Sequence, residues 1–159
     1  MNKVIVQFLG SGDAFGSGGR FQTCIYVDGE DTKFLIDCGA SSLIAMKRYG
    51  VDPSAIDFIL LTHLHGDHFG GVPFLIRETQ IVSQRATPLV IAGPTGIEQR
   101  IHEAMTVFFP GSDRLRLQFP LEFIELSDER PNTLGSFMSH SPAKTLFSRP
   151  NRMKGGSNE

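Results

Sequence analysis

Three histidines and an aspartate lie within six consecutive residues, in a chain that has five histidines in all. These four residues are His63, His65, Asp67 and His68. In an extended segment, side chains two positions apart point to the same side, so His63 and His65 can share one metal ion. A turn after them would carry Asp67 and His68 toward a second position. Imidazole and carboxylate donors suit zinc, and also manganese or iron, and two such ions support hydrolysis. The alternative is a solvated loop, but three histidines at this spacing favour a metal site.

The residues around this cluster predict how it is positioned. Residues 56–61 form a nearly continuous apolar run, typical of a strand buried on both faces, and the cluster begins where that run ends. The segment 70–73 opens a helix near 74–79. Another helix is expected over 43–49, with serines at its start and Gly50 at its end, and a further one follows 93–96 and runs to about 108. The other expected strands are 4–9, 24–27, 33–36, 89–92, 115–119, 121–126 and 134–138.

Composition and charge restrict the class of protein. The 159 residues suffice for one domain, and the order of strands and helices predicts an α+β fold with helices packed on a sheet. A net charge of −2 gives no global case for binding nucleic acid or an anionic membrane. No targeting signal or membrane-length apolar run is found, which predicts a cytoplasmic protein. Cys24 and Cys38 are isolated, and we expect them to be apolar filler in or beside strands.

Residues 62–68, Thr-His-Leu-His-Gly-Asp-His, resemble the HxHxDH signature of the metallo-β-lactamase superfamily. The glycines at 70–71 and the segment 35–39 match that superfamily too. Residues 8–12 and 91–97 resemble its ribonuclease Z-like branch, whose members include tRNA 3′-processing endonucleases and phosphodiesterases. The resemblance covers residues 4–126 and implies an αββα sandwich of which only the N-terminal part is present. We therefore expect an incomplete domain over 1–147 and a disordered polar tail over 148–159.

The resemblance also implies roles for single residues. His63 and His65 would bind the first metal, Asp67 and His68 the second, and Asp67 would be the general base beside the bridging hydroxide. Asp37 would hydrogen-bond a ligand histidine; a turn or helix-start aspartate is the equal alternative. The glycine-rich loop 10–19 would border the site, or would be a plain connecting loop.

The match to the family's metal site is incomplete after His68. The family has a bridging aspartate in a Gly-Asp-Thr-like stretch, and no such stretch follows here. His140, within Ser-His-Ser-Pro, resembles the family's third histidine and is a candidate metal ligand, with a surface histidine as the alternative. His102 falls in a predicted helix and is expected to be structural or exposed.

These observations leave three functions open. The leading one is a metal-dependent hydrolase, of the phosphodiesterase or ribonuclease Z-like kind, which uses a metal-activated hydroxide at a two-zinc site on a small-molecule or phosphodiester substrate. The second is a metal-binding but catalytically incomplete protein or assembly partner. The third is a tRNA-binding module, against which the charge weighs.

A half-fold would also leave apolar sheet surface uncovered, which favours a homodimer. Arginines that would form a basic patch, or else only a solvated surface, are Arg77, Arg85, Arg100, Arg114 and Arg116.

Overall fold

The computed structural model describes residues 3–114, 116–126, 133–134 and 137–138. The chain divides into two compact units, Met1–Leu126 and Ser127–Glu159. In the second unit, the described residues are two short antiparallel strands, β7 (Thr133–Leu134) and β8 (Phe137–Met138). The expected boundary at residue 147 and the tail 148–159 lie outside the described residues and stay predictions.

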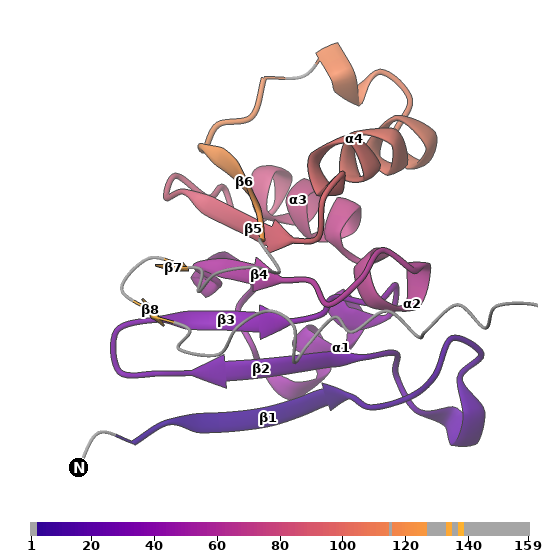
Figure 1. Cartoon of the computed structure of the whole chain (residues 1–159), viewed down its shortest axis with the longest axis vertical. Helices are drawn as coiled ribbons and strands as arrows, with labels where there is room; N and C mark the ends of the chain where they lie inside the picture. The colour runs from indigo at the N-terminus through magenta and orange to yellow at the C-terminus, as the bar shows by residue number, and fades with distance from the viewer. Residues whose placement is uncertain (1–2, 115, 127–132, 135–136, 139–159) are drawn as a thin grey trace, which may run out of the picture. The chain divides into compact units, whose positions relative to one another are not determined.

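The first unit consists of a six-stranded sheet and the helices that connect its strands (Figure 1). The strands, in their order across the sheet, are β1 (Ile5–Gly10), β2 (Cys24–Asp28), β3 (Lys33–Ile36), β4 (Phe58–Leu60), β5 (Leu89–Gly93) and β6 (Leu121–Glu125). The helices are α1 (Ser42–Tyr49), α2 (Gly66–Phe69), α3 (Val72–Ile81) and α4 (Ile97–Phe108), with 3₁₀ turns at Ser17–Gly19, Pro53–Ala55 and Ser112–Arg114. Pairing is antiparallel from β1 to β3 and parallel from β3 to β6.

The parallel connections place α1, α3 and α4 on one face of the sheet. Right-handed crossovers between successive neighbouring strands lead to this arrangement, and Figure 1 shows the strands in front of α1 and α3. Leu35, Ile59 and Ile91 lie in register on β3, β4 and β5, and each is fully buried in the core beneath these helices. Each such side chain contributes roughly 1.5–3 kcal/mol by leaving water. One helix layer over one sheet layer confirms the α+β fold class and forms one half of an αββα sandwich.

The opposite face of the sheet is apolar as well. Because side chains alternate along a strand, the residues next to Leu35, Ile59 and Ile91 point away from the helices. One row across this second face is made by Phe8, Ile25, Ile36, Leu60, Ala92 and Ile124. On β1, Val6 and Phe8 are 55% and 65% exposed. A homodimer formed through this surface stays a prediction.

Most expected elements are present, and two expected strands are wrong. Residues 116–119 do not form a strand; instead Leu117 and Phe119 pack against the core from an irregular segment that Pro120 ends. The alternating pattern there reflects core contacts along a connection between α4 and β6. The single strand expected at 134–138 is replaced by β7 and β8, which pair with each other.

The residues at the helix ends predicted some of the observed helix caps, but not all of them. Gly50 ends α1 with a left-handed φ of 71°, as expected. Ser41 occupies the N-cap position of α1, but its side chain makes no capping hydrogen bond; its hydroxyl accepts from the backbone N–H of Gln22. Helix α2 was not expected, because four residues are too few to show a helical period.

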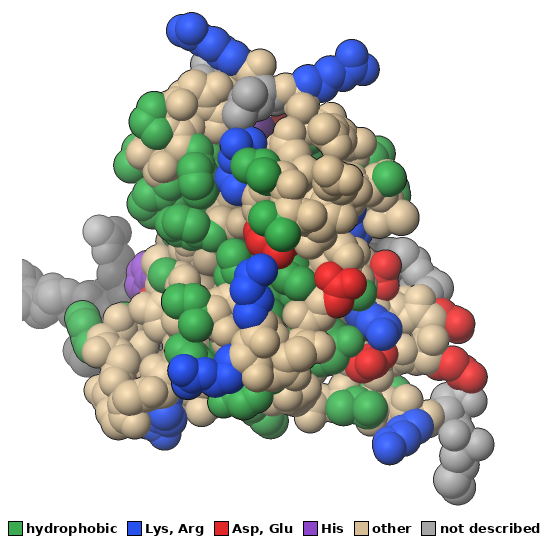
Figure 2. Space-filling view, turned by 180° about the vertical axis from the view of Figure 1, so that it is seen from behind, with side chains coloured by type: hydrophobic (Ala, Val, Ile, Leu, Met, Phe, Trp, Pro, Cys, Tyr) green, Lys and Arg blue, Asp and Glu red, His purple; other side chains and the backbone are tan. Residues whose placement is uncertain are grey.

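Basic side chains are dispersed on the face seen from behind the sheet. Figure 2 shows Lys and Arg side chains standing apart from one another on that face. Arg85, expected at the surface, is 4% exposed, and its guanidinium donates to the carbonyl oxygens of Ser54, Thr87 and Pro88. Its assignment to the surface is wrong, because it satisfies backbone carbonyls in the connections around α3 and β5. Burial lowers the pKa of Arg85.

Among the described residues, none of the helices combines the length and hydropathy that a bilayer crossing requires.

Two turns, one after β3 and one after β4, pack backbone against backbone. The N–H of Cys38 donates to the carbonyl of His68 at 2.6 Å, and the N–H of Gly71 donates to the carbonyl of Cys38 at 2.8 Å. A Cβ on Gly71 would lie 2.3 Å from the carbonyl oxygen of Gly39. A Cβ on Gly39 would lie 2.3 Å from the carbonyl oxygen of Asp67. Glycine is therefore required at both positions by space alone.

We predict that Gly71→Ala lowers the free energy of unfolding by about 1–3 kcal/mol, because the new methyl group must displace backbone rather than a flexible side chain. Gly66→Ala is the matched control, since a Cβ there meets nothing within 4 Å; its effect should stay within about 0.5 kcal/mol. Urea unfolding of both variants measures the difference. Equal effects would contradict the packing argument.

A second prediction concerns the two cysteines, which are free and fully buried as expected for apolar filler. Burial raises the pKa of Cys24 to about 11 and raises the pKa of Cys38 well above its ordinary value. Because the thiolate is the reactive form, neither should react with Ellman's reagent in the folded protein at about pH 8. Both should react after unfolding in guanidinium. Rapid labelling of the folded chain would show that the core opens around them.

Candidate functional site

The histidine cluster lies at the carboxyl end of β4, where the chain leaves the sheet. Leu61 still pairs with β5, since its N–H donates to the carbonyl of Ala92 at 2.8 Å. The next residues, 62–65, are irregular, and α2 follows at once with His65 in its N-cap position. Loops at the carboxyl ends of neighbouring parallel strands meet at one edge of the sheet, so the turn after β3 lies beside this segment.

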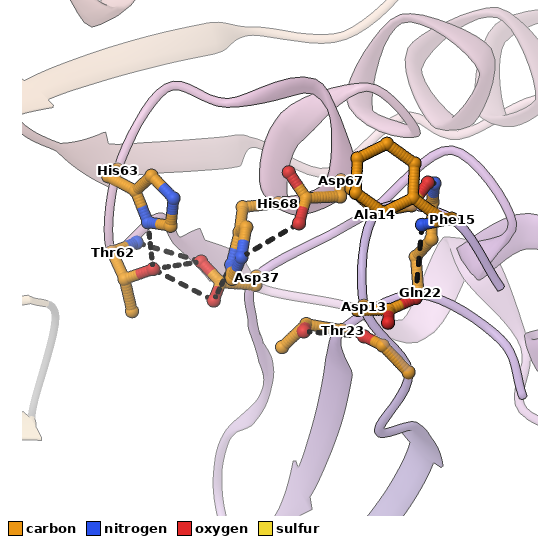
Figure 3. Close-up of polar contacts among 11 residues, drawn as sticks. Asp13, Ala14, Phe15, Gln22, Thr23, Asp37, Thr62, His63, Asp67 and His68 are labelled. Carbon is orange, nitrogen blue, oxygen red and sulfur yellow. Dashed lines mark hydrogen bonds and ion pairs between the residues drawn. The ribbon is translucent and has the colours of Figure 1, made fainter. Parts of the chain in front are cut away.

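Asp37 is the buried centre of this region (Figure 3). It directly follows β3, is 2% exposed, and has a left-handed φ of 60°. Its Oδ1 accepts from the backbone N–H of Thr62 at 2.8 Å, and its Oδ2 lies 2.7 Å from Nδ1 of His68. The Thr62 hydroxyl lies 2.9 and 2.8 Å from its two oxygens. The expected contact between Asp37 and a histidine is present and joins residues 31 positions apart, and the contact with Thr62 joins residues 25 positions apart.

These hydrogen bonds set the orientation of two imidazoles. The Thr62 hydroxyl has a single proton, which it donates to the Asp37 carboxylate. Its contact of 3.1 Å with Nδ1 of His63 therefore has the ring N–H as donor. His68 likewise donates from Nδ1 to Asp37. When the rings are neutral, the lone pair of each is then on Nε2, the nitrogen turned away from Asp37 and Thr62.

The three histidines of the cluster lie together. The ring centroid of His63 is 4.7 Å from that of His65 and 4.0 Å from that of His68. Burial lowers the pKa of His63, and the neighbouring His68 and His65 rings lower it further. A neutral imidazole is the form that binds a metal ion. That His63 and His65 share one metal ion stays a prediction, and the His68 ring is nearer to His63 than the His65 ring is.

Asp67 lies in the first turn of α2, beside His68. Its Oδ2 is 3.3 Å from Nε2 of His68, and its side chain is 17% exposed. Over residues 3–114, 116–126, 133–134 and 137–138, no three His, Cys, Asp or Glu side chains converge in the geometry of a bound metal ion. The donor types nevertheless suit such an ion, because three imidazoles and a carboxylate lie within residues 63–68 and two of the rings are already oriented. Their role as metal ligands stays a prediction.

Of the two remaining histidines, the structure describes one. His102 lies on α4 and is exposed, with its Nε2 3.7 Å from a carboxylate oxygen of Glu98, as expected for a structural or exposed residue. His140, the candidate third histidine, lies outside the described residues.

Thr62 was not singled out from the sequence as a functional residue. Its hydroxyl connects Asp37 with His63, so it holds one ring of the cluster. The one indication of this role in the sequence was its position next to the first histidine, at the end of a buried strand. Its partner could not be identified from spacing alone, because Asp37 is 25 residues earlier.

We predict that Asp37→Asn destabilises the protein by about 1–3 kcal/mol, because the amide can accept from Thr62 or His68 but not satisfy both and its own N–H groups. The control is Asp57→Asn, whose carboxylate accepts from the Lys33 N–H at 2.7 Å in an exposed setting; it should cost less than about 1 kcal/mol. Urea unfolding gives the two values, and ¹⁵N NMR of the His68 ring reports its tautomer. An unchanged ring signal in Asp37→Asn would rule out the proposed orientation of His68.

Comparison with known proteins gives consistent results. A family model described as "Anti-Pycsar protein Apyc1" matches residues 4–104, more than half of the chain. Ribonuclease Z of Enterococcus faecalis is 35% identical over 128 residues, which cover 78% of this chain and 39% of that protein. Ribonuclease Z of Bacillus thuringiensis is 34% identical over 125 residues, 77% of this chain and 39% of that protein. The chain thus spans about two-fifths of the length of these relatives.

Solved structures with the same fold include two of particular use. The short form of human tRNase Z has a TM-score of 0.61 at 29% identity, with 80% of this chain and 47% of that chain covered. The metallo-β-lactamase fold protein YhfI of Bacillus subtilis has a TM-score of 0.64 at 23% identity, with 87% and 51% covered, which shows the fold alone. The chain therefore belongs to the family described as "Anti-Pycsar protein Apyc1", within the ribonuclease Z-like branch of the metallo-β-lactamase superfamily.

Proposed function

We propose that this chain carries the HxHxDH part of a metal-dependent hydrolase that cleaves phosphodiesters. The observation that supports this most strongly is the buried Asp37 carboxylate, which orients His68 directly and His63 through Thr62. A hydrogen bond from the far ring nitrogen is the usual way in which proteins fix a metal-binding histidine. A loop histidine without a metal role has no need of such support.

The imidazole and carboxylate donors of the cluster suit two divalent ions, with zinc as the proposed metal and manganese or iron as alternatives. His63 and His65 would hold one ion, and Asp67 and His68 the other, with His140 as a proposed further ligand. When bound, such ions lower the pKa of water and stabilise negative charge on a phosphoryl oxygen.

The chain's own residues would contribute orientation and proton transfer. Asp37 and Thr62 hold the two rings so that only their Nε2 atoms are presented, which lowers the cost of ordering them when a ligand arrives. Asp67 is the proposed general base: its partly exposed carboxylate stands 3.3 Å from His68, within the same short helix, and can accept a proton from water at the site.

Phosphodiester cleavage is proposed because of the relatives' names. The matched relatives are called Ribonuclease Z, and the matched human structure is a tRNase Z. Hydrolytic chemistry at such a site would serve other esters and amides equally well, so the geometry alone does not choose the substrate. Binding of nucleic acid and formation of a homodimer are likewise proposed for this chain.

The second candidate is a metal-binding protein that lacks turnover. The observation in its favour is that four of the proposed ligands come from the single short segment 63–68. Metal content without hydrolysis would identify it.

The test is elemental analysis of metal per chain together with hydrolysis of bis(p-nitrophenyl) phosphate, for the wild type and for His65→Ala and Asp67→Ala. We expect two metals per chain in the wild type, fewer in His65→Ala, and loss of turnover by at least about 100-fold in both variants, since each removes a metal ligand or the base. His102→Ala is the control, because this exposed imidazole on α4 lies outside the cluster and should change neither readout.

The outcomes separate the two candidates. Bound metal with no hydrolysis in the wild type supports the catalytically incomplete protein. No bound metal, or equal activity in His65→Ala and the wild type, contradicts a metal-dependent site at this loop.

A further inference from the structure

A hollow of about 320 Å³ opens among α3, α4 and β6. These three elements contact one another at the β6 edge of the sheet (Figure 1). No residue of the segment 62–68 lines the hollow, so it is separate from the histidine cluster. Its volume is at the lower end of the range for small-molecule sites in proteins, which suits a ligand smaller than a typical drug.

Most of the wall of this hollow is apolar. The apolar residues come from α3, from α4, and from β6 together with the segment before it; they are Ile76, Ile101, Met105, Leu117 and Leu121. Ile76 and Ile101 are each 1% exposed, so the core holds them in place. An apolar molecule that displaces water from such a wall gains free energy in proportion to the area that it covers.

One charged side chain, Arg77 of α3, also lines the hollow. Its Nη1 donates to Oε1 of Gln80 at 3.3 Å, and its guanidinium carbon lies 5.7 Å from the centroid of the Phe109 ring. Gln80 is itself fixed, because its Nε2 donates to the carbonyl of Arg116 at 3.2 Å. These partners hold the guanidinium in place without neutralising its charge.

The charge and the donors of Arg77 are therefore partly unused. Among the described residues, no carboxylate forms an ion pair with its guanidinium. Its buried Nε has no hydrogen-bond partner among them either, which is unfavourable for a donor that has left water. An anion beside the guanidinium would supply the missing charge, and a carboxylate matches the planar arrangement of the guanidinium donors.

We propose that this hollow binds a small apolar molecule that carries one carboxylate, with the apolar body on the walls and the carboxylate paired with Arg77. A neutral ligand would leave the guanidinium charge uncompensated, and a cationic one would be repelled by it. The site does not depend on the proposed hydrolase, because none of its residues belongs to the histidine cluster.

The test is binding of 4-phenylbutyrate, 4-phenylbutan-1-ol and 4-phenylbutylamine to the full chain, followed by methyl NMR. The three probes share one apolar body and carry a negative charge, no charge and a positive charge at neutral pH. We expect shifts of the Ile76 and Ile101 methyl signals. The dissociation constant of 4-phenylbutyrate should be at least about 10-fold lower than those of the other two probes, as for a hydrogen bond to a charged group.

Three variants locate the binding. Arg77→Met removes the charge and keeps a long apolar side chain, so it should remove the preference for the carboxylate and leave the affinity for the alcohol unchanged. Arg100→Met is the matched control, because this exposed arginine of α4 does not line the hollow, and it should keep the preference. Thr106→Trp replaces an exposed residue that lines the hollow with a large one, and it should weaken the binding of all three probes.

Equal affinity of the wild type for the three probes, or a preference retained in Arg77→Met, would overturn the proposal. So would unchanged binding in Thr106→Trp, or an absence of Ile76 and Ile101 shifts at the highest soluble concentration of 4-phenylbutyrate. Shifts confined to the histidine cluster or to the second face of the sheet would place the binding elsewhere and overturn it too. The NMR spectrum of each variant shows whether it is folded, and the wild-type comparison and Thr106→Trp decide the matter if Arg77→Met is not.

Discussion

The arrangement of the whole site depends on one buried carboxylate. Asp37 follows β3, and its oxygens receive the Thr62 N–H, the Thr62 hydroxyl and the His68 ring. A carboxylate that is 2% exposed is tolerated only where such donors surround it, so the turn that holds Asp37 and the residues that provide the donors, Thr62 and His68, must meet in one arrangement. The glycines at 39 and 71 allow this meeting, because no side chain would fit between the two backbones.

The same constraint explains why the cluster is organised before any ligand arrives. His68 and His63 are oriented by groups that belong to the strand ends, and strand ends in a buried sheet move little. Among the described residues, neither His65 nor Asp67 has a buried carboxylate partner of this kind. The site thus combines two fixed imidazoles with two side chains that retain more freedom to adjust to what they bind.

Much of this fold was accessible from the sequence, and the failures have physical causes. The strand at 33–36 and the helix ended by Gly50 were read from local signals that tertiary packing did not override. The irregular segment at 116–119 alternates like a strand, because a connection that crosses the core also places every second side chain inward. The histidine cluster was visible because its members are adjacent. The importance of Thr62 was not visible in the sequence, because it depends on residues 37, 62 and 68 being close together in space.

The exposed apolar side chains of β1 have a consequence for the tendency of the protein to aggregate. β1 is an outermost strand, and the stretch Val4–Leu9 that contains most of it has no proline and no charge, with Lys3 as the charged residue just before it. Val4, Ile5, Val6 and Phe8 are all exposed. Such a strand can add to the same strand of another chain, which is how ordered aggregates begin. Exposed edge strands of this kind favour edge-to-edge association between copies of a chain, and at β1 this tendency is separate from the chemistry of the histidines.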